Sequence, residues 1–143
     1  MELIIANSKH IVHAQAISNS IGESAKMRGT GIARRSPEYI IKKMESGNAV
    51  IAIENNKFAG FCYIEIWGHG KYVAHSGLIV SPEHRGKGLA KQIKQRVFDL
   101  SKKKFPEAKI FGITTGKAVM RINFELGYNC LLYTSPSPRD ATL

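Results

Sequence analysis

The sequence predicts an α/β protein of the α+β kind, with a mixed and mainly antiparallel sheet flanked by helices. Two observations support this prediction. Three strand-like apolar runs follow one another in the middle of the chain, joined by short polar or glycine-containing connections that are typical of antiparallel hairpins. The third run is followed by a helical pattern and another strand, and such a strand–helix–strand crossover places its two strands side by side and parallel.

The first predicted elements are a strand and two helices. Residues 2–6 have the pattern of a short strand, and Ser8 is a suitable cap for the helix that follows. The glycines of residues 28–35 end that helix, and Ser36 with Pro37 starts a second one over residues 37–46. The first helix has apolar residues at a period close to 3.6, namely Ile11, Ala14, Ile17, Ile21 and Ala25.

The crossover helix and its flanking strands complete the expected order. A helix over residues 88–105 carries apolar residues on one face, and Pro106 ends it. A further strand covers residues 109–114, and a last helix over 117–126 is stopped by Gly127. The three hairpin strands are expected at residues 49–54, 58–67 and 72–80, and the apolar face of the crossover helix comprises Leu89, Ile93, Val97 and Leu100.

Composition is typical of one soluble domain. The chain has 143 residues, of which 43% are hydrophobic and 22% are charged. No apolar run approaches the about 20 residues of a membrane span, and the N-terminus lacks a signal-peptide pattern. We therefore expect a cytoplasmic protein with no membrane partner. Cys62 and Cys130 have no CxxC or histidine neighbours at metal-ligand spacing, so no metal is expected, and Cys62 reads as a small buried hydrophobe.

The formal net charge of +10 indicates an anionic partner or a solvated basic surface. A nucleic acid, a phosphate-bearing cofactor and an acidic substrate are the candidates. The basic residues are dispersed, and no aromatic-interleaved stripe or recognition motif accompanies them, which disfavours a nucleic-acid-binding module. The lysines of residues 102–104 fit the solvated alternative, because they stand at the negative end of a helix dipole.

The C-terminal end reads differently from the rest of the chain. It contains a Ser-Pro-Ser-Pro run without amphipathic period, and residues 130–140 resemble a translated transposase sequencing adapter. We therefore expect a domain over residues 1–129 and a non-native tail over residues 130–143 that adds no packed structure. The native sequence would continue differently after Asn129, and the strand at 109–114 would be left as an exposed sheet edge.

The sequence VSPEHRGKGLAKQI, residues 80–93, joins a strand to the crossover helix through a proline turn and two glycines. It is no P-loop, because Glu83 and not a glycine stands five residues before Gly88 and no Ser or Thr follows. It is no Rossmann fingerprint, because Lys91 replaces the third glycine. Helix N-terminal N–H groups beside bare glycines, with Arg85 and Lys87 adding charge, form an anion cradle that admits a pyrophosphate. An ordinary turn with a glycine helix start is the alternative.

Read as a whole, GLIVSPEHRGKGLA, residues 77–90, resembles the acetyl-CoA motif of the GNAT family of N-acetyltransferases, R/Q-x-x-G-x-G/A. The element order is also that of the family, and FELGY at residues 124–128 resembles its LGF segment. The resemblance implies a GNAT-like fold that lacks its last strands. It also implies transfer of an acetyl group from acetyl-CoA to a primary amine of a small molecule or amino acid, by direct attack in a ternary complex.

The resemblance assigns cofactor contacts mainly to the backbone. The strands at residues 72–80 and 109–114 would separate and admit the pantetheine arm between them. The backbone of Leu78, Ile79 and Val80 would pair with the pantetheine. The N–H groups that would hold the pyrophosphate are those of Arg85, Gly86, Lys87, Gly88, Leu89 and Ala90.

Two departures from the family pattern concern catalysis. Lys117 stands where the family often has an asparagine, and Asn123 stands where it often has a tyrosine that protonates the departing thiolate. Asparagine is a poor acid, so Tyr63, Tyr72, a water molecule or no acid at all remain open. A non-catalytic CoA-binding sensor of the same fold is therefore the alternative function.

An alkylamine with a pKa of about 10 must lose a proton before it attacks, so a carboxylate or histidine base is useful. Glu65 and His75 are the candidates, each with a purely structural alternative. A covalent role for Cys62 is disfavoured because no base lies at a recognisable spacing. A homodimer remains open.

Three arginines are the candidates for acceptor binding. Arg28, Arg34 and Arg35 lie between the first two helices, where the family commonly shapes its acceptor pocket, and could fork a carboxylate. An acidic amino acid such as glutamate would then be the acceptor, and the chain also resembles small transferases linked with N-acylglutamate formation. A solvated basic loop is the alternative.

Overall fold

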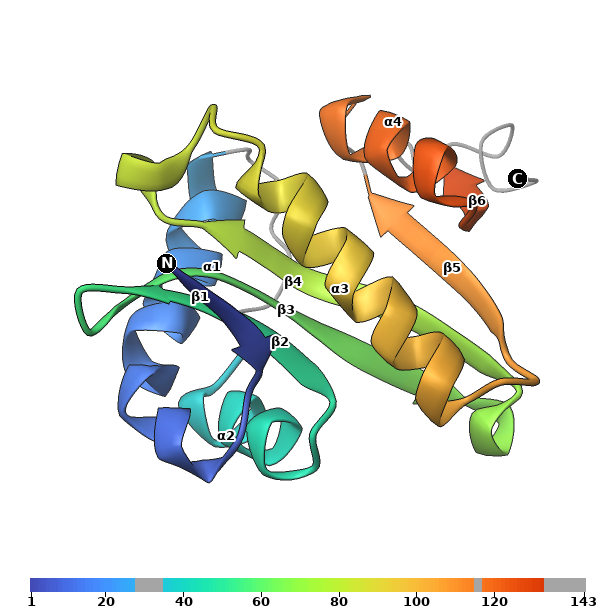
Figure 1. Cartoon of the computed structure of the whole chain (residues 1–143), viewed down its shortest axis with the longest axis horizontal. Helices are drawn as coiled ribbons and strands as arrows, with labels where there is room; N and C mark the ends of the chain where they lie inside the picture. The colour runs from blue at the N-terminus through green and yellow to red at the C-terminus, as the bar shows by residue number, and fades with distance from the viewer. Residues whose placement is uncertain (28–34, 115–116, 133–143) are drawn as a thin grey trace.

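The computed structural model describes residues 1–27, 35–114 and 117–132. Its strands form one six-stranded sheet in the order β1-β2-β3-β4-β5-β6 (Figure 1). The pairs from β1 to β4 are antiparallel, whereas β4–β5 and β5–β6 are parallel. The predicted mixed, mainly antiparallel sheet with a parallel crossover is therefore confirmed. The strands are β1 (Glu2–Ile5), β2 (Ala49–Glu54), β3 (Lys57–Trp67), β4 (Tyr72–Val80), β5 (Lys109–Thr114) and β6 (Asn129–Leu132).

The helices follow the predicted order, with one change at the N-terminus. Their bounds are α1 (Ala14–Met27), α2 (Pro37–Glu45), α3 (Leu89–Lys104) and α4 (Lys117–Leu126), with the 3-10 turns η1 (Ser8–His13), η2 (Gly68–Gly70) and η3 (Pro82–His84). Ser36 caps α2 as expected, with Pro37 in the first turn. The prediction that Ser8 is the first cap is wrong: Asn7 caps η1, and its own N–H donates to His10 Nδ1 at 3.0 Å. This reciprocal pair is a capping box.

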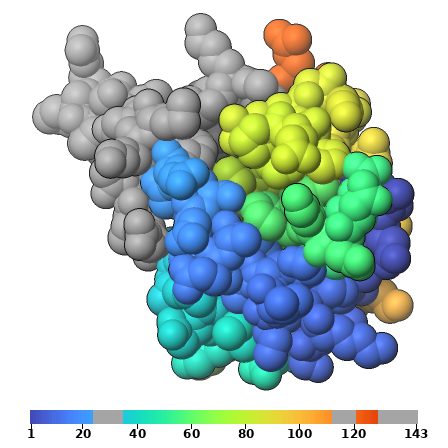
Figure 2. Space-filling model, turned by 90° about the vertical axis from the view of Figure 1, so that its left-hand side faces the viewer, coloured from blue at the N-terminus to red at the C-terminus, as the bar shows by residue number. Residues whose placement is uncertain are grey.

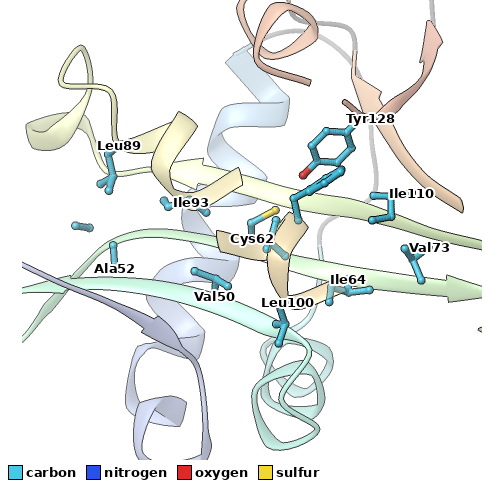
Figure 3. Packing of buried hydrophobic residues seen from close by; sticks show 13 residues of the cluster. Val50, Ala52, Cys62, Ile64, Val73, Leu89, Ile93, Leu100, Ile110 and Tyr128 are labelled. Carbon is cyan, nitrogen blue, oxygen red and sulfur yellow. The ribbon is translucent and has the colours of Figure 1, made fainter. Parts of the chain in front are cut away.

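Helices cover both faces of the sheet (Figure 1). The helix α3 crosses one face, where Leu89, Ile93 and Val97 pack into a core with Cys62 and other residues of β2–β4 (Figure 3). Helices α1 and α2 cover the other face, where Ile17, Ile40 and Met44 pack with Phe61 and Tyr63. Both faces of the central strands are thus buried, and the thiol of Cys62 is buried as predicted. No helix in the described ranges is long and apolar enough to cross a membrane.

A glycine bulge bends β4 in its second half. The register with β3 shifts between the pairs Tyr63↔Ser76 and Phe61↔Ile79, so the extra residue lies at Gly77 or its neighbour. Gly77 has a φ of +67°, and a Cβ at this position would collide with the Tyr63 ring. A bulge twists and bends its strand. The remaining part of β4 is therefore directed away from the line set by its first residues.

The strands β4 and β5 pair over only part of their length. The parallel register joins residues 72–75 with residues 109–112, and residues 76–80 of β4 are paired with β3 but not with β5. The expected separation of these two strands is therefore present. It begins directly before the bulge, at His75, the last β4 residue in the shared register.

The C-terminal expectation is wrong for its first residues. Strand β6 pairs with β5 through Phe111↔Asn129 to Thr114↔Leu132, so residues 130–132 belong to the sheet and β5 is not an edge strand. The physical reason is that an extended apolar segment after Gly127 satisfies backbone groups that β5 would otherwise leave unpaired. Residues 133–143 lie outside the described residues, so the expectation of a non-native tail stays a prediction there.

Gly77→Ala is expected to destabilise the fold by about 2–4 kcal/mol, because it combines overpacking against Tyr63 with a left-handed backbone. Gly127→Ala is the matched control: its φ is +89°, but a Cβ there would meet nothing within 4 Å. The control should lose only about 1 kcal/mol. Urea unfolding of both variants measures the difference, and equal losses would contradict the proposed role of the bulge.

Candidate active site

The loop after β4 is held in place by backbone hydrogen bonds. Ser81 N–H donates to the carbonyl of Ala59 at 2.8 Å, which ties the end of β4 to β3. The turn η3 then closes through His84 N–H to Ser81 O at 2.9 Å. The chain leaves this turn at Arg85 and enters α3 at Leu89.

Gly86 and Gly88 form an open backbone cradle at the start of α3. Both have left-handed backbones, with φ values of +77° and +79°, and a Cβ at either position would meet nothing within 4 Å. Gly88 is the N-cap of α3, a helix of 16 residues. The first N–H groups of a helix have no partner within it and carry the positive end of its dipole. Open space therefore lies next to backbone donors.

Positive side chains surround this cradle. Arg85 is exposed and anchored by its Nε, which donates to the carbonyl of Val80 at 3.0 Å. Lys87 is exposed between the two glycines, whereas Lys91 pairs with Glu125 of α4 at 2.9 Å. Bare backbone and cationic side chains together suit a phosphate-bearing ligand.

The predicted pantetheine strand leads from this cradle to the bulge. Leu78 and Val80 are partly buried and pack against the core under α3, whereas Ile79 is buried on the opposite face. All three lie beyond the β4–β5 register, so the β4 edge at these residues faces the point where the two strands part. The role of these three residues in pantetheine binding stays a prediction.

A polar cluster lies on the other face of the sheet, between α2 and β3. Arg35 Nε donates to the Tyr63 hydroxyl at 2.7 Å, and this bond raises the pKa of the guanidinium. The ring of Tyr39 meets the ring of Tyr63 edge-on, with centroids 5.7 Å apart. Lys43 Nζ lies within 6 Å of both ring centroids, at 5.3 and 5.6 Å. Because the Tyr63 ring also contacts Gly77, this cluster reaches the β4 bulge.

Glu65 belongs to this cluster and is partly exposed. Its Oε1 accepts a hydrogen bond from the Tyr39 hydroxyl and lies 3.4 Å from Lys43 Nζ. Burial, followed by the bond to Glu65, raises the pKa of Tyr39, so the phenol remains a donor at neutral pH. Glu65 is therefore an anchored carboxylate rather than a simple solvent-facing strand residue. Tyr39 and Lys43 were not predicted, because no local pattern relates them to Glu65.

His75 lies on the opposite face from Glu65, beneath α3. It is 2% exposed, with Nδ1 2.5 Å from the Tyr128 hydroxyl and Nε2 2.6 Å from Ser101 Oγ. Burial, with a smaller effect of Lys94, lowers the pKa of His75 to about 2, so the imidazole is neutral. Both ring nitrogens are engaged in the interior. This geometry supports the structural alternative for His75, and the two candidate bases are not brought together.

The remaining candidates are distributed as follows. Tyr72 is 43% exposed at the start of β4, at the far end of the strand from the bulge. Asn123 is 1% exposed, and its Oδ1 has no hydrogen-bond partner among the described residues. Arg28 and Arg34 lie outside the described residues, and so does the side chain of Lys117. No group of three or more metal-ligating side chains occurs among the described residues.

Comparison with known proteins agrees with this geometry. The model of the acetyltransferase (GNAT) family matches residues 28–119, and the chain therefore belongs to this family. No curated protein sequence matches the chain. The predicted family is therefore confirmed.

Solved structures share the fold at low sequence identity. The N-acetylglutamate synthase of Neisseria gonorrhoeae, complexed with coenzyme A and N-acetyl-glutamate, is 17% identical with a TM-score of 0.64; the match covers 82% of this chain and 26% of the synthase. Rv2747 from Mycobacterium tuberculosis, in complex with CoA and NLQ, is 12% identical with a TM-score of 0.70 and coverages of 98% and 78%. A predicted acetyltransferase of Clostridium acetobutylicum with acetyl-CoA is 17% identical, with a TM-score of 0.62 and coverages of 96% and 92%. The chain thus spans about a quarter of the synthase.

The buried His75 should make stability sensitive to acid. The folded-state pKa of His75 is about 2, whereas its ordinary value is about 6.5. Between these two pH values the unfolded chain binds a proton at His75 that the folded chain does not. The free energy of unfolding therefore falls as the pH falls. Between pH 7 and pH 5 the protein should lose about 2 kcal/mol more than the non-titrating variant His75→Gln. Urea unfolding at both pH values measures this, and parallel losses would contradict it.

Proposed function

We propose that this protein is an acetyl-CoA-dependent N-acetyltransferase that acetylates a primary amine of a small molecule or amino acid by direct attack in a ternary complex. The observation that carries the proposal is the open cradle of Gly86 and Gly88 at the N-terminus of α3, next to the point where β4 and β5 part. Backbone donors, bare glycines and exposed cations suit a pyrophosphate there. An elongated thioester arm would then follow the β4 edge toward the bulge.

In this mechanism the cosubstrate supplies an activated acetyl group, and the chain binds and orients both reactants. The N–H groups of residues 85–90 would hold the pyrophosphate, and the backbone of residues 78–80 would hold the pantetheine arm. The amine would approach from the α2 face, where the Tyr63 ring contacts Gly77. Glu65 is our candidate for accepting the amine proton, directly or through water, because it is a carboxylate on this face with partial exposure.

We propose a carboxylate-bearing amine, such as an amino acid, as the acceptor. Arg35 uses Nε to bind Tyr63, and a guanidinium has two further NH2 groups that can fork a carboxylate. The complex of the N. gonorrhoeae synthase with N-acetyl-glutamate supports this choice by analogy of fold, and glutamate is the first acceptor to test. Arg28 and Arg34 remain candidates for the same role.

A CoA-binding sensor is the second candidate function. It is favoured by Asn123, whose amide cannot protonate a departing thiolate and whose buried Oδ1 has no partner in the part of the chain that the structure describes. Binding of acetyl-CoA without turnover on a panel of amines would establish the sensor. Release of free CoA that depends on the amine would establish the enzyme.

Gly88→Trp should abolish acetyl-CoA binding, because the side chain would fill the open space beside the backbone donors. Lys87→Ala should weaken binding only about fivefold or less, because one exposed charge contributes about 1 kcal/mol or less. Isothermal titration calorimetry measures both, with circular dichroism as the test of folding. Unchanged affinity of the Gly88 variant would overturn the proposed cofactor site.

Arg35→Gln should raise the KM for an amino-acid acceptor about tenfold to a hundredfold, because a charged hydrogen bond to the carboxylate is lost. The KM for the α-carboxamide of the same amino acid should change little. Arg96→Gln removes the same charge from an exposed position of α3 and serves as the control. Equal effects of Arg35→Gln on both acceptors would show that Arg35 does not bind the carboxylate.

A further inference from the structure

We propose that a hydrogen-bonded chain of Ser81, His84 and Glu54 positions the cofactor loop, so that His84 is a positioning residue for acyl-CoA binding. This inference rests on the proposed function, because it assumes that the loop of Gly86 and Gly88 binds the pyrophosphate. Glu54 ends β2, Ser81 directly follows β4, and His84 ends the turn η3. None of them is part of the cradle itself.

The chain has short hydrogen bonds on both sides of the imidazole. His84 Nδ1 lies 2.7 Å from Ser81 Oγ, and His84 Nε2 lies 2.6 Å from Glu54 Oε2. His84 is only 9% exposed, although its neighbours Glu83 and Arg85 are exposed. The His84 side chain is therefore directed inward from a surface turn. Both of its ring nitrogens have hydrogen-bond partners there, Ser81 and Glu54.

The chemistry of the partners assigns the protons. The bond from His84 lowers the pKa of Glu54, so its carboxylate is ionised at neutral pH and can only accept. Nε2 must then carry a hydrogen, and in the tautomer with its hydrogen on Nε2 the ring Nδ1 accepts from the Ser81 hydroxyl. One tautomer thus satisfies all three side chains at once, and the imidazole plane is held from both ends.

We call this chain of Ser81, His84 and Glu54 the brace, and it fixes a loop whose glycines have no side-chain contacts of their own. Gly86 and Gly88 have no side chains, and the space beside both is open. His84 lies two residues before Gly86, and Ser81 N–H is already bound to Ala59 of β3. Glu54 adds a link to the β2–β3 hairpin, so the direction in which the loop enters α3 is set by two strands rather than by the turn alone.

Ser81, His84 and Glu54 also form part of the wall of a cavity. The cavity has a volume of about 440 Å³ and lies between α1, the β2–β3 hairpin and the turn η3. Figure 2 shows these three segments side by side on one face of the molecule. His84, Ser81 and Glu54 all line this cavity.

A Ser–His–carboxylate chain beside a cavity also raises the question of a hydrolytic triad. Such a site needs backbone N–H groups aimed at an oxyanion. Here the amides of Ser81, His84 and Arg85 donate to the carbonyls of Ala59, Ser81 and Pro82. Because these donors are used within the fold, the geometry favours positioning over nucleophilic catalysis.

The test measures acetyl-CoA affinity by calorimetry for the whole chain and for variants of the brace. His84→Leu should raise the Kd about fivefold to tenfold, because the loop loses the orientation that a hydrogen bond maintains. His84→Gln retains one donor and one acceptor and should stay within about threefold of wild type. His10→Leu is the matched control. His10 is a histidine of similar burial, 8% exposed, but its Nδ1 accepts a hydrogen bond from the Asn7 N–H at the start of η1. Its Kd should not change.

Further measurements separate positioning from stability. In His84→Leu, the KM for acetyl-CoA should rise while the KM for the acceptor stays constant. Glu54→Gln should weaken binding in the wild-type background but have no effect in His84→Leu. If His84→Leu does not fold, Ser81→Ala, which removes a single hydroxyl, replaces it and should raise the Kd about threefold.

The outcomes are distinguishable. Failure of the wild-type protein to bind acetyl-CoA would overturn the proposed function and this inference with it. Wild-type binding combined with unchanged Kd values in the His84, Ser81 and Glu54 variants would overturn the positioning role alone. Hydrolysis of a simple ester that is lost in Ser81→Ala would replace positioning by nucleophilic catalysis.

Discussion

Strand β4 pairs with β3 from Tyr72 to Val80 but with β5 only over residues 72–75, and the glycine bulge at Gly77 permits both. A side chain at this position would collide with the Tyr63 ring, so the bulge and the tyrosine depend on each other. The bulge bends β4 after the four residues that pair with β5, and the bent part leads through η3 to the glycines at the start of α3. The remaining features of the candidate site are arranged around this bend.

The two faces of the sheet have different roles because side chains alternate along β3. Cys62 and Ile64 face the core under α3, whereas Tyr63 and Glu65 face α2. The glycine-containing loop leads directly into α3 on one side of the sheet, and the polar cluster with Arg35 lies on the α2 side. The contact between Tyr63 and the bulge in β4 joins the two. On the α3 side, His75 anchors β4 to Ser101 of α3 and to Tyr128 directly before β6.

Glu65 and His75 illustrate what the sequence could not decide. Both are polar residues within apolar strand runs, and both are candidates for a base on sequence grounds. The register pairs His75 with Ile64 and Glu65 with Ala74, so the two side chains emerge on opposite faces. Burial then gives His75 a low pKa and two internal partners, whereas Glu65 remains partly exposed. Register is a property of two strands together, and neither strand alone contains it.

The sequence by itself determined the fold class, the order of helices and strands as far as α4, and the glycine-containing turn before α3, because each depends on local features. Apolar periods, caps and the glycines at 86 and 88 act within a few residues of their own position. Only the tertiary structure decided which side chains meet: Tyr39 with Glu65, Arg35 with Tyr63, and His84 with Glu54 are 26, 28 and 30 residues apart in the chain. It also paired β6 with β5. Such contacts depend on register, burial and side-chain reach, which arise only when distant segments pack together.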